Sequence, residues 1–169
     1  TSKTYQQALI SGLKVGYSGV PGAFGYIAAR RMFSNANLVA YSDFSTAYKA
    51  CENGEIDIVV LPTENSYAGD VGTVMDLMFS GSLYVNQMID LDVVHNLIAC
   101  DGATKDSVKK VYSHAQALAQ CAEYIHLNDF EEVEYPNTAM AAKMIAEKAD
   151  PTIAAIASIE TAELYNLNV

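Results

Sequence analysis

The chain has 169 residues, of which 51% are hydrophobic and 18% are charged, so its composition is that of a folded protein with one domain or two small lobes. Twenty acidic residues against ten Lys and Arg give a formal net charge of −10, which argues against nucleic acid and anionic membranes as partners. The sequence contains neither an apolar stretch long enough to span a membrane nor a basic-then-apolar signal pattern at its start.

The first half of the chain alternates strand and helix patterns after a short arm. The run 56–61 is almost uninterruptedly apolar, which is typical of a strand buried on both faces. The helix before it has N-cap chemistry at Ser42 and Asp43 and stops at Asn53-Gly54. We expect strands at 13–17, 38–41 and 56–61, and helices from about 24 to 33, at 45–52 and at about 73–79.

The second half repeats the alternation after a long extended run at 84–100, which predicts a crossover between two lobes. Strands that alternate with helices of this length predict parallel α/β lobes with right-handed crossovers. We expect strands at 108–112, 132–135 and 152–157, and helices at 115–127, 138–149 and 159–165. The domain organisation predicted is an arm at 1–13, a first lobe at 14–80, a crossover at 81–98 and a second lobe at 99–169.

Several strands end in a small hydroxyl or amide residue just before a helix. Ligands of open α/β sheets bind outside the carboxyl ends of the strands, where helix N-termini attract anions. The sequence therefore predicts a site for a small anion that is held by dipoles and polar side chains rather than by many cations. The residues concerned are Ser18, Asn65 with Ser66, Ser113, Asn137 with Thr138, and Ser158.

Glycines follow the first strand at positions 19, 22 and 25. Their spacing is not G-x-G-x-x-G, and Asp43 is the only nearby acid that could bind a ribose, so a dinucleotide site is not favoured. Two interpretations remain open and are compatible with each other. The glycines form a tight turn into a helix, or their backbone N–H groups approach an anion.

The segment Glu64-Asn65-Ser66 follows the apolar strand directly. Asn65 offers two donors and an acceptor, and Ser66 can donate or accept, so both are candidates for contact with a ligand. The alternative is a turn whose polar side chains only shape the loop.

The segment 113–121 opens the first helix of the second lobe. Ser113 is a natural N-cap, and Gln116 and Gln120 lie four residues apart on one helix face. His114 is either an acid, a base or a donor to a carboxylate, or else an exposed first-turn histidine. His95 and His126 lack such a context and are expected to be structural.

Two further features complete the candidate chemistry. Asn137 and Thr138 cap the next helix. Cys51, Cys100 and Cys121 stand at wide spacing that fits neither a disulfide framework nor a C-x-x-C metal site, so we expect reduced thiols in a cytoplasmic protein. No H-E-x-x-H, Walker A or G-x-S-x-G motif occurs.

Taken in order, these motifs resemble the prephenate dehydratases over residues 13–169 without a gap. The Glu-Asn-Ser block and the Ser-His-x-Gln-Ala-x-x-Gln-Cys block are specific in combination, although neither is specific alone. The blocks that carry the resemblance are Val15–Phe24, Pro62–Ser66 with Gly69 and Val71, Tyr112–Cys121, Asn137–Ala139, and Ala154–Ser158 with Ala162–Tyr165.

The resemblance implies an α/β fold with two lobes of the type II periplasmic-binding-protein kind and an active site in the cleft between them. It implies a lyase of phenylalanine biosynthesis that removes water and CO₂ from prephenate to give phenylpyruvate, with no metal or organic cofactor. It also implies a cytoplasmic homodimer or higher oligomer. The alternatives are an arogenate dehydratase, or a regulatory module of the same fold that binds a small anion or amino acid without chemistry.

Site residues follow from the resemblance position by position. Residues expected to act in catalysis are Asn65, Ser66, Ser113, Gln116 and Thr138. Residues expected to bind substrate are Ser18, Gly22, Glu64, His114, Gln120 and Asn137.

The chain departs from the family pattern at several points. Gly25 replaces the usual Ser or Thr, Ala115 replaces Pro, and Asn137 replaces Ser. The family's Thr-Arg-Phe motif, whose Thr is taken as the proton donor, is absent and normally lies beyond the final residues 166–169. We therefore expect a catalytic domain cut before that motif, before a strand that returns to the first lobe, and before an ACT domain that senses phenylalanine.

Overall fold

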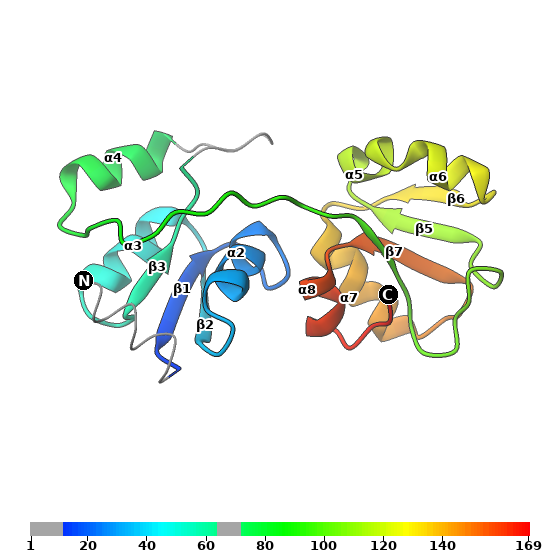
Figure 1. The fold of residues 1–169 in the computed structure, drawn as a ribbon, viewed down its shortest axis with the longest axis horizontal. Helices are drawn as coiled ribbons and strands as arrows, with labels where there is room; N and C mark the ends of the chain where they lie inside the picture. Colours follow the sequence, from blue (N-terminus) through cyan, green and yellow to red (C-terminus); the bar gives the residue numbers. More distant parts are fainter. Residues whose placement is uncertain (1–11, 64–71) are drawn as a thin grey trace. The chain divides into compact units, whose positions relative to one another are not determined.

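The computed structural model describes residues 12–63 and 72–169, and the chain divides into two compact units, Thr1–Leu91 and Asp92–Val169. Strands and helices alternate along each unit (Figure 1), so the predicted α/β class is confirmed. Within the described ranges, no helix combines the length and the hydropathy that a membrane span requires.

The first unit contains a parallel sheet of three strands in the order β2-β1-β3. The central strand β1 is buried from Val15 to Tyr17, and the helices pack their apolar residues, such as Ile27 and Ala47, against the sheet. The strands are β1 (Lys14–Ser18), β2 (Asn37–Tyr41) and β3 (Ile58–Val60), and the helices are α2 (Phe24–Met32), α3 (Phe44–Glu52) and α4 (Gly72–Ser80).

The apolar strand at 56–61 is shorter and more accessible than its sequence predicts. Only Ile58–Val60 pair, and all three residues are half-buried. β3 stands at the edge of the three described strands with β1 as its one neighbour, so part of its surface stays accessible. The expectation of a strand buried on both faces is therefore wrong here.

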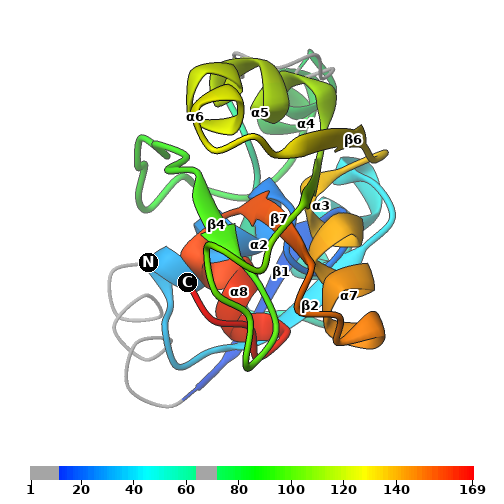
Figure 2. The same ribbon diagram turned by 90° about the vertical axis from the view of Figure 1, so that its right-hand side faces the viewer.

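The second unit contains a four-stranded mixed sheet in the order β4-β7-β5-β6, with α5 and α6 on one face and α7 and α8 on the other (Figures 1 and 2). Its strands are β4 (Asn96–Ile98), β5 (Lys110–Ser113), β6 (Glu131–Glu134) and β7 (Ile153–Ala157). Its helices are α5 (Ala115–Gln120), α6 (Ala122–Leu127), α7 (Thr138–Lys148) and α8 (Ile159–Leu164).

Strand β7 is the strand that is buried on both faces. Ile153, Ala155 and Ala157 join one core cluster with residues of α7 and α8. Ala154 and Ile156 join a second cluster with Leu118 and Ile125 of α5 and α6. Alternate side chains thus serve opposite faces, as the two-residue period of a strand requires.

Two features of the second unit differ from the sequence expectation. Strands β5, β6 and β7 are parallel as predicted, but β4 runs antiparallel to β7, with Asn96 opposite Ala157. The helix expected at 115–127 is divided into α5 and α6 at Cys121, whose backbone leaves helical geometry at φ −102° and ψ 10°. Neither glycine nor proline marks this break.

Candidate functional site

Three helices of the second unit begin at the carboxyl ends of its parallel strands. α5 follows β5, α7 follows β6, and α8 follows β7. Since β5, β6 and β7 are parallel neighbours, these helix starts share one edge of the sheet, which is the edge where ligands of such sheets bind. We call it the carboxyl edge.

Each of these helices has a side-chain cap at the carboxyl edge. Asn137 Oδ1 accepts the N–H of Met140 at 2.7 Å, and Ser158 Oγ accepts the N–H of Thr161 at 3.1 Å. The predicted capping role of Asn137 is therefore confirmed. The amide oxygen of Asn137 is thus occupied by the cap. Its NH₂ group can still donate a hydrogen bond beside the positive end of the α7 dipole.

Ser113 does not cap α5, contrary to the sequence expectation. It is the last residue of β5, and it lies on the same face as Val111, so its side chain is fully buried. Its Oγ donates to the carbonyl oxygen of Ile156 at 2.8 Å and so ties β5 to β7. The N-cap position moves one residue on, to His114.

His114 is exposed, and its Nδ1 accepts the N–H of Gln116 at 3.2 Å. With Nδ1 as an acceptor, the neutral ring carries its proton on Nε2, which makes Nε2–H a donor. The adjacent Ser113 hydroxyl donates to a backbone carbonyl within the sheet, so these two residues do not form a nucleophile–base pair.

Gln116 and Gln120 are both exposed on α5, four residues apart, as predicted. Gln120 Oε1 accepts from His95 Nε2 at 2.5 Å. Sequence reasoning missed His95, because its partner stands 25 positions away and no local motif joins them. The antiparallel strand β4 brings His95 to the carboxyl edge, since the next residue, Asn96, pairs with the last residue of β7.

Thr138 completes the candidates of the second unit as the first residue of α7, where it is half-buried. α7 spans 11 residues, so its N-terminus carries a developed partial positive charge. Amide donors, a histidine N–H and this helix start make the carboxyl edge suited to bind carboxylates.

The candidate residues of the first unit stand at the end of β1. Ser18 is half-buried, and the turn after it contains Gly19 at φ +111° and Gly22 at φ +92°. These left-handed angles are the conformations that glycine adopts at little cost, so the tight-turn interpretation is confirmed. The side chain of Ala23, the N-cap of α2, makes no capping bond. Glu64, Asn65 and Ser66 lie outside the described residues.

Gly25 has a steric reason to lack a side chain. A Cβ at this position would lie 2.6 Å from the backbone oxygen of Ser18 and about van der Waals distance from the ring of Tyr17. The first turn of α2 therefore packs directly on the end of β1. The hydroxyl residue usual in the resembling family would not fit this backbone without a shift.

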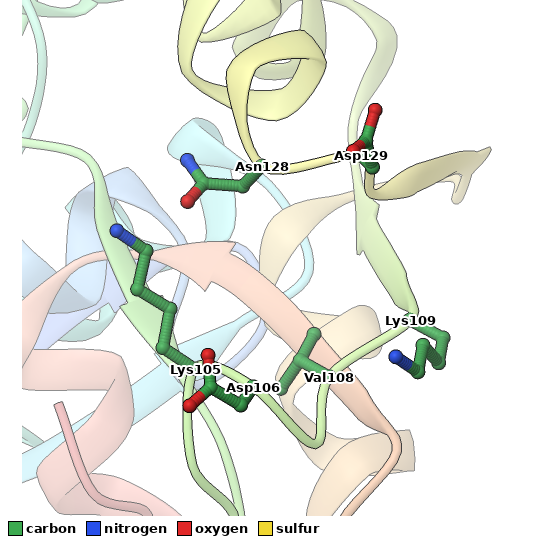
Figure 3. Close-up of a pocket in the computed structure, with 6 residues that line it drawn as sticks. All are labelled: Lys105, Asp106, Val108, Lys109, Asn128 and Asp129. Atoms are coloured by element: carbon green, nitrogen blue, oxygen red, sulfur yellow. The ribbon is translucent and has the colours of Figure 1, made fainter.

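A hollow of about 380 Å³ lies on the other side of the same unit, at the amino ends of β5 and β6. Figure 3 shows that loop residues such as Lys105 and Asn128 line it. It is therefore separate from the carboxyl edge. Among the residues that the structure describes, no group of His, Cys, Asp and Glu could hold a metal ion.

All three cysteines are free. Cys100 is buried, and Cys51 and Cys121 are half-buried. Burial raises the pKa of the Cys51 and Cys121 thiols, so both are protonated at neutral pH and are poor nucleophiles.

Comparison with known sequences assigns most of the chain to one family. The family model described as prephenate dehydratase matches residues 15–169. The chain is 33% identical over 159 residues to arogenate dehydratase/prephenate dehydratase 1 of Arabidopsis thaliana, covering 94% of this chain and 41% of that protein. It is 35% identical over 160 residues to the bifunctional chorismate mutase/prephenate dehydratase of Neisseria gonorrhoeae, covering 93% and 44%. The chain thus spans about two fifths of the length of these curated relatives.

Solved structures agree on the fold. The prephenate dehydratase of Staphylococcus aureus is similar with a TM-score of 0.73 and 28% identity, over 92% of this chain and 58% of that one. That of Arthrobacter aurescens, in complex with L-Phe, gives 0.67 and 26%, over 93% and 54%. GqqA, described as a novel type of quorum quenching acylase, gives 0.78 and 27%, over 92% and 57%. The predicted α/β fold with two compact lobes is confirmed.

Proposed function

The chain belongs to the prephenate dehydratase family, and from this premise we propose that the protein carrying it converts prephenate to phenylpyruvate, CO₂ and water. The observation that carries the proposal is the carboxyl edge of the second unit. There, uncharged donors and the start of α7 stand together without a concentration of cations, in a chain with a net charge of −10. Such an edge suits a small ligand with carboxylates, and prephenate has two.

The reaction has three requirements. The protein must bind both carboxylates of prephenate, deliver a proton to the leaving hydroxyl, and let the ring carboxylate depart as CO₂. The bond from the ring to its carboxylate breaks, and its electron pair enters the ring. The bond from C4 to the hydroxyl then breaks, and the hydroxyl takes up a proton to leave as water. The step consumes one proton and produces an aromatic ring.

We propose that Gln116, Thr138 and Asn137 meet the substrate at the carboxyl edge. Their position at or near helix starts supports this, since N–H donors there bind carboxylates well. The Nε2–H of His114 is proposed as a further donor. Ser113 is proposed to act indirectly, by fixing the end of β5 beneath these residues, and its hydrogen bond to the Ile156 carbonyl oxygen supports this role.

We propose that the first unit contributes through Ser18, Gly22 and the segment Glu64-Asn65-Ser66. Support for this part comes from the family match and from the turn at Gly19–Gly22, whose two glycines have left-handed backbone angles and no side chain. The crossover at 81–98 belongs to the same proposal.

Arogenate is the alternative substrate. Several relatives are named arogenate dehydratases, and arogenate differs from prephenate only in an amino group in place of the keto oxygen. We propose, in addition, a cytoplasmic homo-oligomer with phenylalanine as an effector. The free thiols support the compartment, and the L-Phe complex of the Arthrobacter protein supports the effector.

The experiment offers prephenate and arogenate separately to the intact protein that contains these residues, at neutral pH. Formation of phenylpyruvate or of phenylalanine reports the reaction and the substrate preference. Gln116→Leu is expected to lower kcat/KM about tenfold or more, whereas the exposed Gln87 is a matched control whose change to Leu leaves it unaltered. If the protein binds a substrate without turning it over, the alternative of a non-catalytic binding module replaces the lyase. If the protein shows no binding and no turnover of either substrate, the proposal is overturned.

A further inference from the structure

His95 stands at the carboxyl edge although it belongs to no helix or strand. The next residue, Asn96, pairs with Ala157 at the end of β7. The Asn96 side chain also donates to the carbonyl oxygen of Val94 at 3.0 Å, which holds the backbone on either side of His95. The backbone around His95 is therefore held independently of the contact between its half-buried ring and α5.

The contact itself fixes the direction of the hydrogen bond. Gln120 Oε1 can only accept, so His95 Nε2 carries the proton and donates. This donor exists in the Nε2–H tautomer of the neutral ring and in the charged ring alike.

The bond also determines what Gln120 presents to its surroundings. An unrestrained glutamine amide can turn by about half a rotation and offer either its oxygen or its NH₂ group. With Oε1 held by His95, the NH₂ group is turned away from the ring. Gln120 is exposed at the end of α5, where a side chain contributes little to folding.

We propose that His95 is a positioning residue, which holds the Gln120 amide so that its NH₂ group donates to a carboxylate of the substrate. This inference rests on the proposed function and adds a residue and a role to it. Without His95, the amide oxygen would face the anion part of the time, and the amide would have to be ordered on binding. His95 thus acts on substrate affinity through Gln120.

The test uses a double-mutant cycle in the intact protein. His95→Phe keeps a ring but loses the donor, whereas the amide NH₂ of His95→Gln can reach the place of Nε2. We expect H95F to raise KM for the preferred substrate about fivefold to tenfold with a smaller change in kcat, and H95Q to restore most of the affinity. In a Gln120→Ala background, H95F should change KM less than twofold, since its partner is gone.

Several outcomes would overturn the inference. The first is an unchanged KM in H95F or in Q120A. The second is an equal rise in KM on His95→Phe in the unmodified protein and in the Q120A protein. The third is a lower melting temperature in H95F that H95Q reverses without restoring KM. The side-chain NH₂ signals of Gln120, recorded without substrate by NMR, give a readout independent of activity and should move in H95F but little in H95Q. If the unmodified protein turns over neither substrate, the proposed function fails, and the NMR signals alone still decide whether His95 holds the amide.

Discussion

The first strand of the first unit, β1, leads into its helix differently from the strands of the second unit. In the second unit, side chains cap the helices at the carboxyl edge, as Asn137 and Ser158 show. In the first unit, a turn with left-handed glycines leads into α2, and the N-cap Ala23 makes no side-chain capping bond. The difference teaches that polar residues at the strand ends of the second unit both cap helices and face the proposed ligand, whereas the end of β1 depends on the absence of a Cβ.

The largest expected effect tests the first unit. Gly25→Ala should lower the free energy of unfolding by about 2 kcal/mol, because the new Cβ would meet the Ser18 carbonyl at 2.6 Å and neither backbone can yield cheaply. Helix propensity alone predicts a gain of about 1 kcal/mol, so the sign is informative. Urea unfolding measures it. Gly102→Asn, at a left-handed position with open space, is the control: it adds a side chain without a clash and should cost only about 1 kcal/mol, from backbone strain alone.

Ser113→Ala is expected to have the next largest effect and tests the second unit. Loss of the buried bond to Ile156 should cost about 1 to 2 kcal/mol of unfolding free energy. The exposed Ser34 serves as a control, and its change to Ala should stay within about 0.5 kcal/mol. An S113A protein with unaltered stability but lost turnover would show that the hydroxyl serves chemistry and not the sheet.

Much of the fold could be predicted because its signals are local. Alternation of apolar strands with helical patterns predicts every described helical segment, with α5 and α6 as one helix, and most strands. Asn137 is recognisable as a cap from its type and place. Ser113 was misassigned by a single position. Whether it ends β5 or caps α5 depends on its burial beside Val111, which is a tertiary property.

Other features had no local signal at all. The sequence predicts only a crossover where the short strand β4 lies, because its pairing partner β7 stands about 60 residues further along the chain. The contact of His95 with Gln120 depends on that pairing, and so it was missed too. The division between α5 and α6 at Cys121 carries neither glycine nor proline, and the structure offers no residue that explains it.

Substitutions at Asn137 separate its capping of α7 from its proposed contact with the substrate. Asn137→Ala should cost about 1 kcal/mol through loss of the cap on α7. Asn137→Asp keeps an accepting oxygen for Met140, so stability should hold, but a carboxylate beside an anionic substrate should raise KM about tenfold. Asn137→Ser should preserve both properties. If KM in N137D equals that of the unmodified protein, the start of α7 does not face the substrate.

The smallest expected effect concerns the one side-chain cap described in the first unit at a strand end, Asp43. The N–H and side chain of Thr46 hold the pKa of this carboxyl below its ordinary value. A lowered folded-state pKa stabilises the protein fully above the unfolded value, near pH 4, and the stabilisation is lost as pH falls through the folded value. Asp43→Asn keeps a capping oxygen without titrating. The stability difference between the two proteins should therefore shrink on acidification below about pH 4, and a constant difference would contradict the assignment.

The central claim is that a dicarboxylate substrate binds at the carboxyl edge of the second unit. Titration of the isotope-labelled intact protein with prephenate, followed by the NMR signals of its amides, tests it most directly. The account predicts saturable shifts at His114, Gln116, Gln120 and Thr138, while the lining of the hollow at Lys105 and Asn128 stays unperturbed. Shifts confined to that hollow, with the starts of α5 and α7 unchanged, would contradict it.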